Sequence, residues 1–486
     1  MILIKLLCFT FLFFISASVI KAQTGWTSVT SFGSNTGNLN MYSYAPTTLP
    51  ANAPLVIVLH GCSQTASQYA TESGWNILAN QHQFYTVYPE QNTANNSSRC
   101  FNWFNYADQN KGQGEVLSIK QMIDYMTSNY SIDANRIYIT GLSAGACMTN
   151  VMLACYPELI SGGAVMAGTA FKSSTNAFTA SNAMNGFVTH SATAWGDSVR
   201  NQNPTYTGSY PKVALFQGVN DFVVNANNVT EIIKQWTNVH NTDQTYDLST
   251  SSFNGNSSVT KYEYNNSSNT AVVEAYMISG MGHAIAIDVG SCYQQGGTTG
   301  TYALDFNFYS SFWAANFFNI LQAPSVINGL TTVVANASMV TYSVPVTSGN
   351  NYTWAVPAGA TIISGQGTNS IAVNFSATSG YVSLTETDAG GCKIGPIKLW
   401  VTIGTPTFID AKNEFIYYNA QSKSLIINNA TATINSVKLY SIDGKLLQQW
   451  KENETEYHLD NIINKGLYIL EYEKDKQLIH QKIIIF

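Results

Sequence analysis

Charged side chains are scarce in this chain of 486 residues. Asp, Glu, Lys and Arg make up 10% of the sequence, whereas they make up roughly 25% of a typical soluble protein. The formal net charge is −6. Neither the amount nor the sign of this charge favours binding to nucleic acid or to an anionic membrane surface. We therefore expect neither as a partner, and we expect a surface on which Asn, Ser and Thr replace charge.

Long apolar runs are also missing, except at the N-terminus. Lys5 precedes an apolar run over residues 6–15 and small residues that end at Ala22. This order is typical of a signal peptide and predicts that residues 1–22 are cleaved. A membrane anchor is the alternative, but the run is short for a membrane span. No later segment can cross a bilayer, so we expect an exported protein, secreted or at the cell surface.

Cysteine is sparse as well, with seven in the chain and six after residue 22. Export permits disulfides. Cys62 and Cys100 each lie beside a loop of the candidate site described below, so a bridge between them is the first choice. Cys147 and Cys155 are about 12 Å apart along one predicted helix, which is too far for a disulfide. Buried free thiols are the alternative, above all for Cys147 and Cys392.

Residues 23–322 alternate between strand-like and helix-like segments. The strand-like runs are 55–59, 84–88, 136–140, 212–216 and 272–278, and the helix-like runs are 115–126, 146–153 and 230–239. Such alternation predicts an α/β domain, in which helices cover a parallel or mostly parallel sheet.

The last third of the chain has the pattern of β structure without evident chemistry. Over residues 323–404, short strand patterns alternate with Gly, Pro and Asn turns, which predicts a small β-sandwich. Over residues 405–486 lysine becomes frequent, and Asp443-Gly444 predicts a hairpin turn. We therefore expect two small all-β modules after the α/β domain.

The most informative motif is Gly141-Leu142-Ser143-Ala144-Gly145. It follows a strand-like run and precedes a helix-like run, which is the context that a nucleophile elbow requires. The small residues let the backbone turn sharply, so that Ser143 can project above the sheet. The Ala144 N–H, at the positive end of the helix, can face an oxyanion. An ordinary tight turn is the alternative.

A serine nucleophile needs a base, and the base needs an orienting acid. Asp221 and His283 each follow a strand-like run, and open α/β sheets place their sites at the carboxyl ends of strands. The chain order Ser143, Asp221, His283 is that of α/β-hydrolases. Asp288 and Asp305 are the alternatives for the acid.

These residues predict hydrolysis of an ester without a cofactor or a metal. Ser143 Oγ attacks the carbonyl, His283 takes its proton and returns one to the leaving alcohol, and Asp221 orients the imidazole. The loop after the first buried strand supplies the second oxyanion donor, for which the Cys62 N–H is our choice. His60 lies in the same loop and is more easily explained as a structural residue.

The motifs of the α/β domain resemble those of the esterase, poly(3-hydroxybutyrate) depolymerase family. The matching segments are Leu59-His-Gly-Cys-Ser-Gln-Thr65, Arg99-Cys-Phe-Asn-Trp103, Gly114-Glu-Val-Leu-Ser-Ile119, Gly141-Leu-Ser-Ala-Gly-Ala146, Trp195-Gly-Asp-Ser-Val-Arg200 and Gly280-Met-Gly-His283. That family is similar to carbohydrate esterase family 1, which includes acetylxylan and feruloyl esterases. The resemblance covers residues 25–320. It implies an α/β-hydrolase fold, the triad above, the Cys62 N–H as oxyanion donor and a cleft aromatic at Trp103.

Two departures from the family pattern lie near the expected cleft. Gln217 stands where the family usually has histidine, and residues 284–287 replace a stretch that usually contains proline. Gln217 is therefore a candidate substrate-binding residue, together with Trp103 and Trp195, although the two tryptophans fit a core role equally well. The resemblance implies an extracellular polyester as substrate. Acetyl or feruloyl groups on plant polysaccharide are the alternative, and a glycan-binding surface adhesin is a remote third hypothesis.

The two tail modules carry resemblances of their own. Residues 324–403 resemble the PKD-like β-sandwiches of Bacteroidetes surface proteins. Residues 410–486 resemble the C-terminal sorting domain of the type IX secretion system, on the segments Lys438-Leu-Tyr, Asp443-Gly-Lys and Lys465-Gly-Leu-Tyr-Ile469. This second resemblance implies the secretion machinery as a partner. A passive β domain is the alternative.

Overall fold

The computed structural model describes most of the chain after residue 23. The described ranges are 24–322, 325–347, 349–388, 390–404, 416–419, 422–427, 434–442, 444–450, 456–459, 463, 466–474 and 477–485. The expected signal segment 1–22 and the turn residue Asp443 lie outside them. The chain divides into two compact units, Met1–Pro324 with Asp388–Ile394, and Ser325–Thr387 with Gly395–Phe486.

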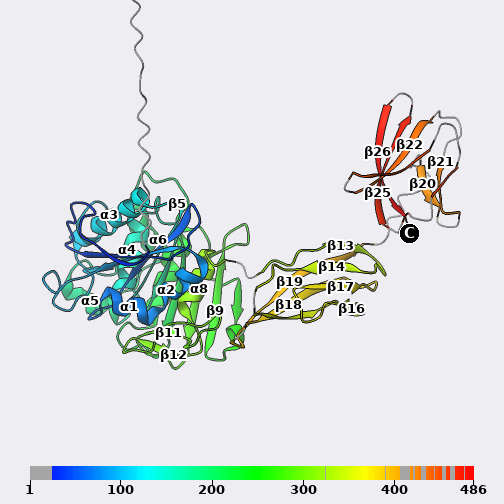
Figure 1. The fold of residues 1–486 in the computed structure, drawn as a ribbon. Helices are drawn as coiled ribbons and strands as arrows, with labels where there is room; N and C mark the ends of the chain where they lie inside the picture. Colours follow the sequence, from blue (N-terminus) through cyan, green and yellow to red (C-terminus); the bar gives the residue numbers. More distant parts are fainter. Residues whose placement is uncertain are drawn as a thin grey trace, which may run out of the picture. The chain divides into compact units, whose positions relative to one another are not determined.

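The first unit contains a sheet of ten strands with helices on both faces (Figure 1). The strands are β1 Gly25–Val29, β2 Asn40–Ala45, β3 Ala53–Leu59, β4 Tyr85–Glu90, β5 Ile132–Leu142, β6 Gly162–Met166, β7 Lys212–Gly218, β8 Leu248–Thr250, β9 Val259–Asn265 and β10 Ala271–Ile278. Their order across the sheet is β1-β2-β4-β3-β5-β6-β7-β10-β9-β8.

The centre of this sheet is parallel and its two edges are antiparallel. Strands β4, β3, β5, β6, β7 and β10 run parallel to one another, whereas β1, β2, β8 and β9 pair antiparallel. The short link 266–270 between β9 and β10 can only reverse the chain, because a parallel neighbour needs a long crossover. The prediction of a mostly parallel sheet is therefore confirmed.

Helices cover both faces of the sheet because its central strands are apolar on both sides. The helices are α1 Ala66–Ser73, α2 Trp75–His82, α3 Gly114–Asn129, α4 Ala144–Cys155, α5 Ala177–Met184, α6 Ala192–Arg200, α7 Asn227–Val239 and α8 Ser310–Phe318, with short helices η1 Tyr106–Asp108 and η2 Phe253–Gly255 and a small sheet of β11 Ile285–Ile287 and β12 Ala303–Asp305. In β3, Leu55 and Ile57 join the core that contains α3 and α4, while Val56 and Val58 join the core that contains α1, α2 and α8.

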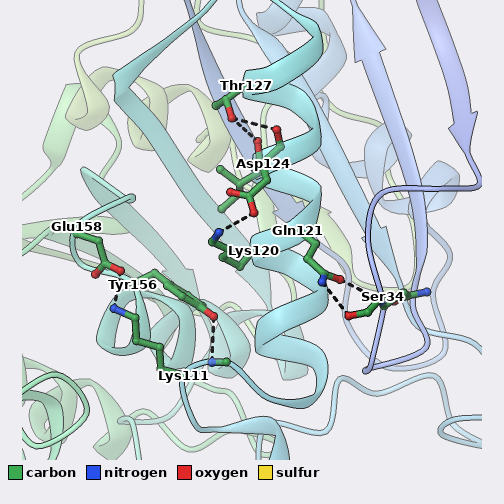
Figure 2. A network of polar contacts seen from close by, with 11 residues as sticks. Ser34, Lys111, Lys120, Gln121, Asp124, Thr127, Tyr156 and Glu158 are labelled. Carbon is green, nitrogen blue, oxygen red and sulfur yellow. Dashed lines mark hydrogen bonds and ion pairs between the residues drawn. The ribbon is translucent and has the colours of Figure 1, made fainter.

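The outer side of α3 is tied to neighbouring segments by polar contacts (Figure 2). Gln121 Nε2 donates a hydrogen bond to Ser34 Oγ at 2.9 Å, and Lys120 pairs with Asp124 one turn along the helix at 2.6 Å. Near the start of the helix, Gly112 N donates to Tyr156 Oη at 3.1 Å. The contact of Gly112 lies just before the N-terminal turn of α3, which matters for the site because Glu115 lies in that turn.

The second unit contains only β structure in the described ranges. A four-stranded sheet (β13 Thr332–Val334, β15 Asn351–Ala355, β18 Gly380–Thr387, β19 Lys393–Gly404) and a three-stranded sheet (β14 Val340–Ser343, β16 Thr361–Ser364, β17 Ser370–Asn374) share one apolar core, as in a β-sandwich.

Two further sheets follow, of β20 Ile416–Asn419, β21 Ser424–Ile427 and β24 Glu456–His458, and of β22 Ile434–Ser441, β23 Leu446–Trp450, β25 Gly466–Lys474 and β26 Gln477–Ile485. Strands β22 and β23 form an antiparallel pair where the sequence predicts a hairpin. Within the described part of the chain, every helix is too short or too polar to span a bilayer.

Candidate active site

A strained turn connects β5 to α4 at Ser143. This residue has φ 56° and ψ −118°, a backbone conformation that costs a residue with a Cβ about 1–3 kcal/mol and persists where the surrounding structure requires it. A Cβ on Gly145 would lie 2.4 Å from the Leu59 carbonyl oxygen, and one on Gly141 would lie 2.5 Å from that of Gly145. The glycines of the motif are thus required by close contact between the start of α4 and the end of β3.

The Ser143 side chain faces a small pocket. The pocket has a volume of about 130 Å³ and is lined by Gly61, Cys62, Leu142, Ser143, Met184, Val223, His283 and Tyr302. Ser143 N donates to Met166 O, and Ser143 O accepts from Cys147 N, both at 2.9 Å. The backbone on both sides of the serine is therefore fixed, while its hydroxyl remains beside the pocket.

Asp221 and His283 meet at the carboxyl ends of β7 and β10. His283 Nδ1 donates to Asp221 Oδ2 at 2.8 Å. The other carboxylate oxygen accepts from the backbone N–H groups of Val223 and Val224, both at 2.8 Å, and Asp221 is only 2% exposed. The carboxylate is thus held in one orientation, and it can fix the tautomer of His283.

Ser143 and His283 line the same pocket, although no hydrogen bond joins Ser143 Oγ to His283 in the described structure. Such contacts are often long in free enzymes and tighten only when substrate is bound. The arrangement can therefore support nucleophilic attack by a serine hydroxyl that is assisted by the imidazole of His283.

The two alternative acids lie elsewhere. Asp288 Oδ1 accepts from Gln295 Nε2 at 3.0 Å, and burial raises the pKa of its carboxyl. Asp305 is exposed, and its Oδ1 accepts from the backbone N–H of Asn307. The structure therefore brings only Asp221 of the three candidate carboxylates into contact with the imidazole.

Two backbone N–H groups near Ser143 remain candidates for binding an oxyanion. The Ala144 N–H is the first of α4 and has no partner inside the helix. The Cys62 N–H has no protein acceptor among the described residues, and Cys62 lines the pocket next to Ser143. A disulfide between Cys62 and Cys100, with Cα atoms 4.2 Å apart, holds this loop. The predicted bridge is thus confirmed.

The remaining cysteines divide into one further bridge and two thiols. Cys147 and Cys155 are buried and free, as their spacing along the helix suggested. Cys392 forms a disulfide with Cys292, 100 residues away, so the free-thiol alternative for Cys392 is wrong. Cys392 lies in the segment Asp388–Ile394, which groups with the first unit although it is distant in sequence. Spacing in the sequence does not reveal this.

A buried carboxylate that the sequence analysis did not single out supports the Cys100 loop. Glu115 accepts hydrogen bonds from the side chain of Gln91 at 2.5 Å and from both the backbone and the side chain of Asn102, at 2.8 and 2.7 Å. Burial, reinforced by Asp108, raises the pKa of Glu115 to about 8. The only signal for this residue was its place in the matching segment that begins at Gly114.

The structure places three candidate substrate-binding residues outside the pocket lining. Trp195 is 1% exposed, and its indole N–H donates to Glu231 Oε2 at 2.7 Å. Trp103 is buried in the same core. Gln217 is 2% exposed, and its amide donates to Asp221 Oδ2 at 3.2 Å. The large aromatic side chains are drawn into the core by their apolar area, and Gln217 contacts the acid instead of the pocket.

The apolar wall of the pocket comes from smaller side chains. Leu142, Met184, Val223 and Tyr302 line it beside the reactive groups. In the described ranges, no cluster of three or more His, Cys, Asp or Glu side chains could hold a metal ion.

Comparison with known proteins places this site in a family. Residues 40–246 match the family described as Esterase PHB depolymerase, and residues 320–395 match a PKD-like domain. Poly(3-hydroxyalkanoate) depolymerase C of Paucimonas lemoignei is 45% identical over 307 residues, which cover 63% of this chain and 72% of that protein. An acetylxylan esterase of Coprinopsis cinerea is 35% identical over 264 residues, which cover 53% and 69%.

A solved structure shares the fold. The acetyl xylan esterase from Aspergillus awamori superposes with a TM-score of 0.52 at 24% identity, covering 61% of this chain and 99% of that one. The first unit thus has an α/β-hydrolase fold, followed by small β modules.

Proposed function

Because this chain belongs to the esterase PHB depolymerase family, and is a carboxylic ester hydrolase, we propose that Ser143, His283 and Asp221 are its catalytic triad. The observation that carries the proposal is the hydrogen bond between His283 Nδ1 and Asp221 Oδ2, beside a pocket that Ser143 also lines. All three residues follow the carboxyl ends of parallel strands, where α/β sheets place their sites.

The reaction follows from these positions. Ser143 Oγ attacks the ester carbonyl and transfers its proton to His283 Nε2, while Asp221 stabilises the imidazolium. The carbonyl oxygen becomes negative and is bound by the Cys62 and Ala144 N–H groups, each worth on the order of 3 kcal/mol in the transition state. His283 then protonates the leaving alcohol. Water, activated by the same imidazole, hydrolyses the acyl-enzyme and restores the serine.

The substrate that we propose is an extracellular polyester of short hydroxyalkanoic acids. The poly(3-hydroxyalkanoate) depolymerase that is 45% identical to this chain is named for such a polymer. The small pocket with apolar walls also fits a short aliphatic acyl unit. An acetyl ester on xylan is the second candidate, because an acetylxylan esterase is 35% identical and an acetyl group also fits this pocket.

A panel of substrates separates these candidates. Purified protein is tested on p-nitrophenyl butyrate, a poly(3-hydroxybutyrate) film, acetylated xylan and methyl ferulate, with Ser143→Ala as the blank. Clearing of the film without acetate release from xylan is expected. Release of acetate or ferulate with an intact film would replace the polyester by a polysaccharide ester.

We further infer that the protein is exported, with residues 1–22 as its signal segment and residues 405–486 as a sorting module for the secretion machinery. The β22–β23 pair at the predicted hairpin is consistent with this module. Fractionation of the native host followed by mass spectrometry tests the proposal. A cell-associated product that begins at Met1 and ends at Phe486 would contradict it.

A further inference from the structure

A second and larger pocket lies at the opposite edge of the sheet from the candidate active site. Its volume is about 630 Å³, against about 130 Å³ for the pocket at Ser143, and it falls within the range typical of ligand sites. Its lining includes Ser161, Lys212 and Ala271, which lie at the amino ends of the parallel strands β6, β7 and β10. The proposed triad follows carboxyl ends, so a ligand in this second pocket does not compete with an ester at Ser143.

The two cationic side chains of this pocket are already bound to the ends of helices. Arg200 Nη1 donates to Asn238 O in the last turn of α7 at 3.3 Å, and Arg200 Nη2 pairs with Asp197 at 2.8 Å. Lys212 Nζ donates to Phe317 O in the last turn of α8. Cations are favourable at such helix ends, where carbonyl groups lack partners. Because the described lining also holds no Asp or Glu, the pocket favours an uncharged ligand.

His240 supplies a hydrogen-bond acceptor to this pocket. Its Nε2 lies 3.0 Å from Pro211 O. A carbonyl oxygen can only accept, so Nε2 carries the proton and Nδ1 is an unprotonated acceptor. Burial lowers the pKa of His240, so the ring is neutral at pH 7. Among the described residues none donates to Nδ1, which leaves this nitrogen available to a ligand hydroxyl.

Two tyrosines form an aromatic wall of the pocket. The ring centroids of Tyr206 and Tyr210 are 5.3 Å apart, with their planes at 83°. Tyr206 Oη donates to Ser209 O at 2.7 Å, which fixes that ring, whereas Tyr210 Oη has no partner within the described ranges. An aromatic ring with a polar tip can cover an apolar face of a ligand and bind its polar edge.

The other free groups of the lining are small and neutral. Thr207, Asn241 and Thr270 carry hydroxyl or amide side chains that bond to no described residue. Such groups both donate and accept hydrogen bonds. The matching ligand carries several hydroxyl groups on a compact carbon skeleton with apolar C–H faces, and it bears no charge. This combination is the chemistry of a neutral sugar.

From these observations we propose that the second pocket is a binding site for a neutral oligosaccharide. One sugar ring lies against Tyr206 and Tyr210, and its hydroxyl groups bond to His240 Nδ1 and Tyr210 Oη. The site does not depend on the proposed triad, and it would hold the protein on a glycan while the catalytic pocket faces away. A plant polysaccharide and another glycan present the same chemistry, so the test compares different oligosaccharides.

The experiment measures binding of xylotetraose, cellotetraose and maltotetraose to the purified protein by isothermal titration calorimetry. None of these sugars carries an ester, so binding is separate from hydrolysis. We expect at least one of them to bind with a Kd of about 1 mM or below, and its identity distinguishes the sources. Sodium 3-hydroxybutyrate is the charged comparison and should not bind to this pocket.

Two tyrosine variants test the place of the sugar. Tyr206→Ala removes one ring and should weaken binding by roughly 10-fold or more, and Tyr210→Phe removes only a hydroxyl and should weaken it by roughly 3- to 10-fold. The matched controls are Tyr246→Ala and Tyr246→Phe, because Tyr246 is also exposed and pairs with another tyrosine ring, yet lines neither pocket. Both should keep the affinity within about 2-fold. Should Tyr206→Ala not fold, Tyr210→Phe still decides.

Three outcomes would overturn the inference. They are no binding of any of the three oligosaccharides at millimolar concentrations, equal affinity in the Tyr210 and Tyr246 variants, and binding of 3-hydroxybutyrate that is lost in Tyr210→Phe. Modification of the active serine with an organophosphate should leave the sugar affinity unchanged, and its loss would place the sugar at Ser143 instead. Failure of the proposed function is distinct, because full activity in Ser143→Ala would remove the triad without changing oligosaccharide binding.

Discussion

The two halves of the candidate site are built in different ways. On the Gly61–Cys62 and Gly141–Gly145 side, the proposed oxyanion donors are backbone groups, and the backbone there is held by glycine contacts, a strained serine and a disulfide. On the Asp221–His283 side, the proposed acid and base are side chains, and the carboxylate is held by hydrogen bonds from loop backbone. We call these the backbone half and the side-chain half. Damage to the first should affect folding as well as rate, whereas damage to the second should affect rate alone.

Ser143→Ala removes the proposed nucleophile, a side chain carried by the backbone half, and has the largest expected effect. Turnover of p-nitrophenyl butyrate should fall by roughly 10⁴- to 10⁶-fold, because the remaining groups cannot form the acyl-enzyme. Its melting temperature should stay within a few degrees of the parent protein. Turnover within 10-fold of the parent protein would show that Ser143 is not the nucleophile, and the comparison of the two halves would no longer hold.

Asp221→Asn tests the side-chain half. The amide cannot fix the imidazole in the required tautomer, so kcat should fall by roughly 10⁴-fold. Asp288→Asn is the matched control and should leave kcat within about 3-fold. The reverse pattern in steady-state kinetics would move the acid to Asp288.

Gly145→Ala tests the backbone half through stability. The new Cβ would lie 2.4 Å from Leu59 O and 2.6 Å from His60 O, so α4 must shift away from β3. We expect the free energy of unfolding to fall by about 3 kcal/mol or more, measured by urea denaturation. Gly282→Ala serves as control, since its nearest atom would be 3.9 Å away. A tolerated Gly145→Ala would contradict the proposed close approach.

Acid should destabilise the backbone half through His60. Its pKa is lowered by burial from 6.5 to about 4 in the folded protein, so the unfolded chain binds more protons between these pH values. The free energy of unfolding should therefore fall as pH drops from 6.5 to 4, by up to about 3 kcal/mol from this residue. His60→Asn should reduce this acid sensitivity in thermal denaturation, and an unchanged pH dependence would argue against a neutral buried His60.

The smallest expected effect is the reaction of the free thiols of Cys147 and Cys155 with a thiol reagent. Burial raises the pKa of Cys147 to about 11 and that of Cys155 to about 12, so neither should react with Ellman's reagent at pH 8 in the native protein. A chain without residues 1–22 should show two reactive thiols after denaturation, because the other four cysteines form disulfides. Four thiols would place the Cys292–Cys392 bridge in doubt.

Local motifs were enough to predict the turn at Ser143 in the backbone half. The residues packed around it depend on contacts between distant parts of the chain, which the sequence did not reveal. The G-x-S-x-G pattern depends on atoms within five residues of one another, so the elbow at Ser143 was evident from the sequence. Trp195 illustrates the opposite case. An aromatic residue in a matching motif suited both a cleft and a core. Only its burial in the apolar core, with its indole N–H bonded to Glu231, shows that Trp195 belongs to the core.

The sequence by itself determined the fold class and the order of the three proposed catalytic residues, and it made Cys62–Cys100 the first choice for a bridge. These follow from hydrophobic periodicity and from motifs at strand ends, which are local properties of the chain. Only the tertiary structure decided which carboxylate meets His283, that Gln217 contacts the acid, that Glu115 supports the Cys100 loop and that His60 bonds to the Gly61 carbonyl of the oxyanion loop. Their partners come together only when separate loops pack at one edge of the sheet, and burial then selects which protonation state of His60 can persist.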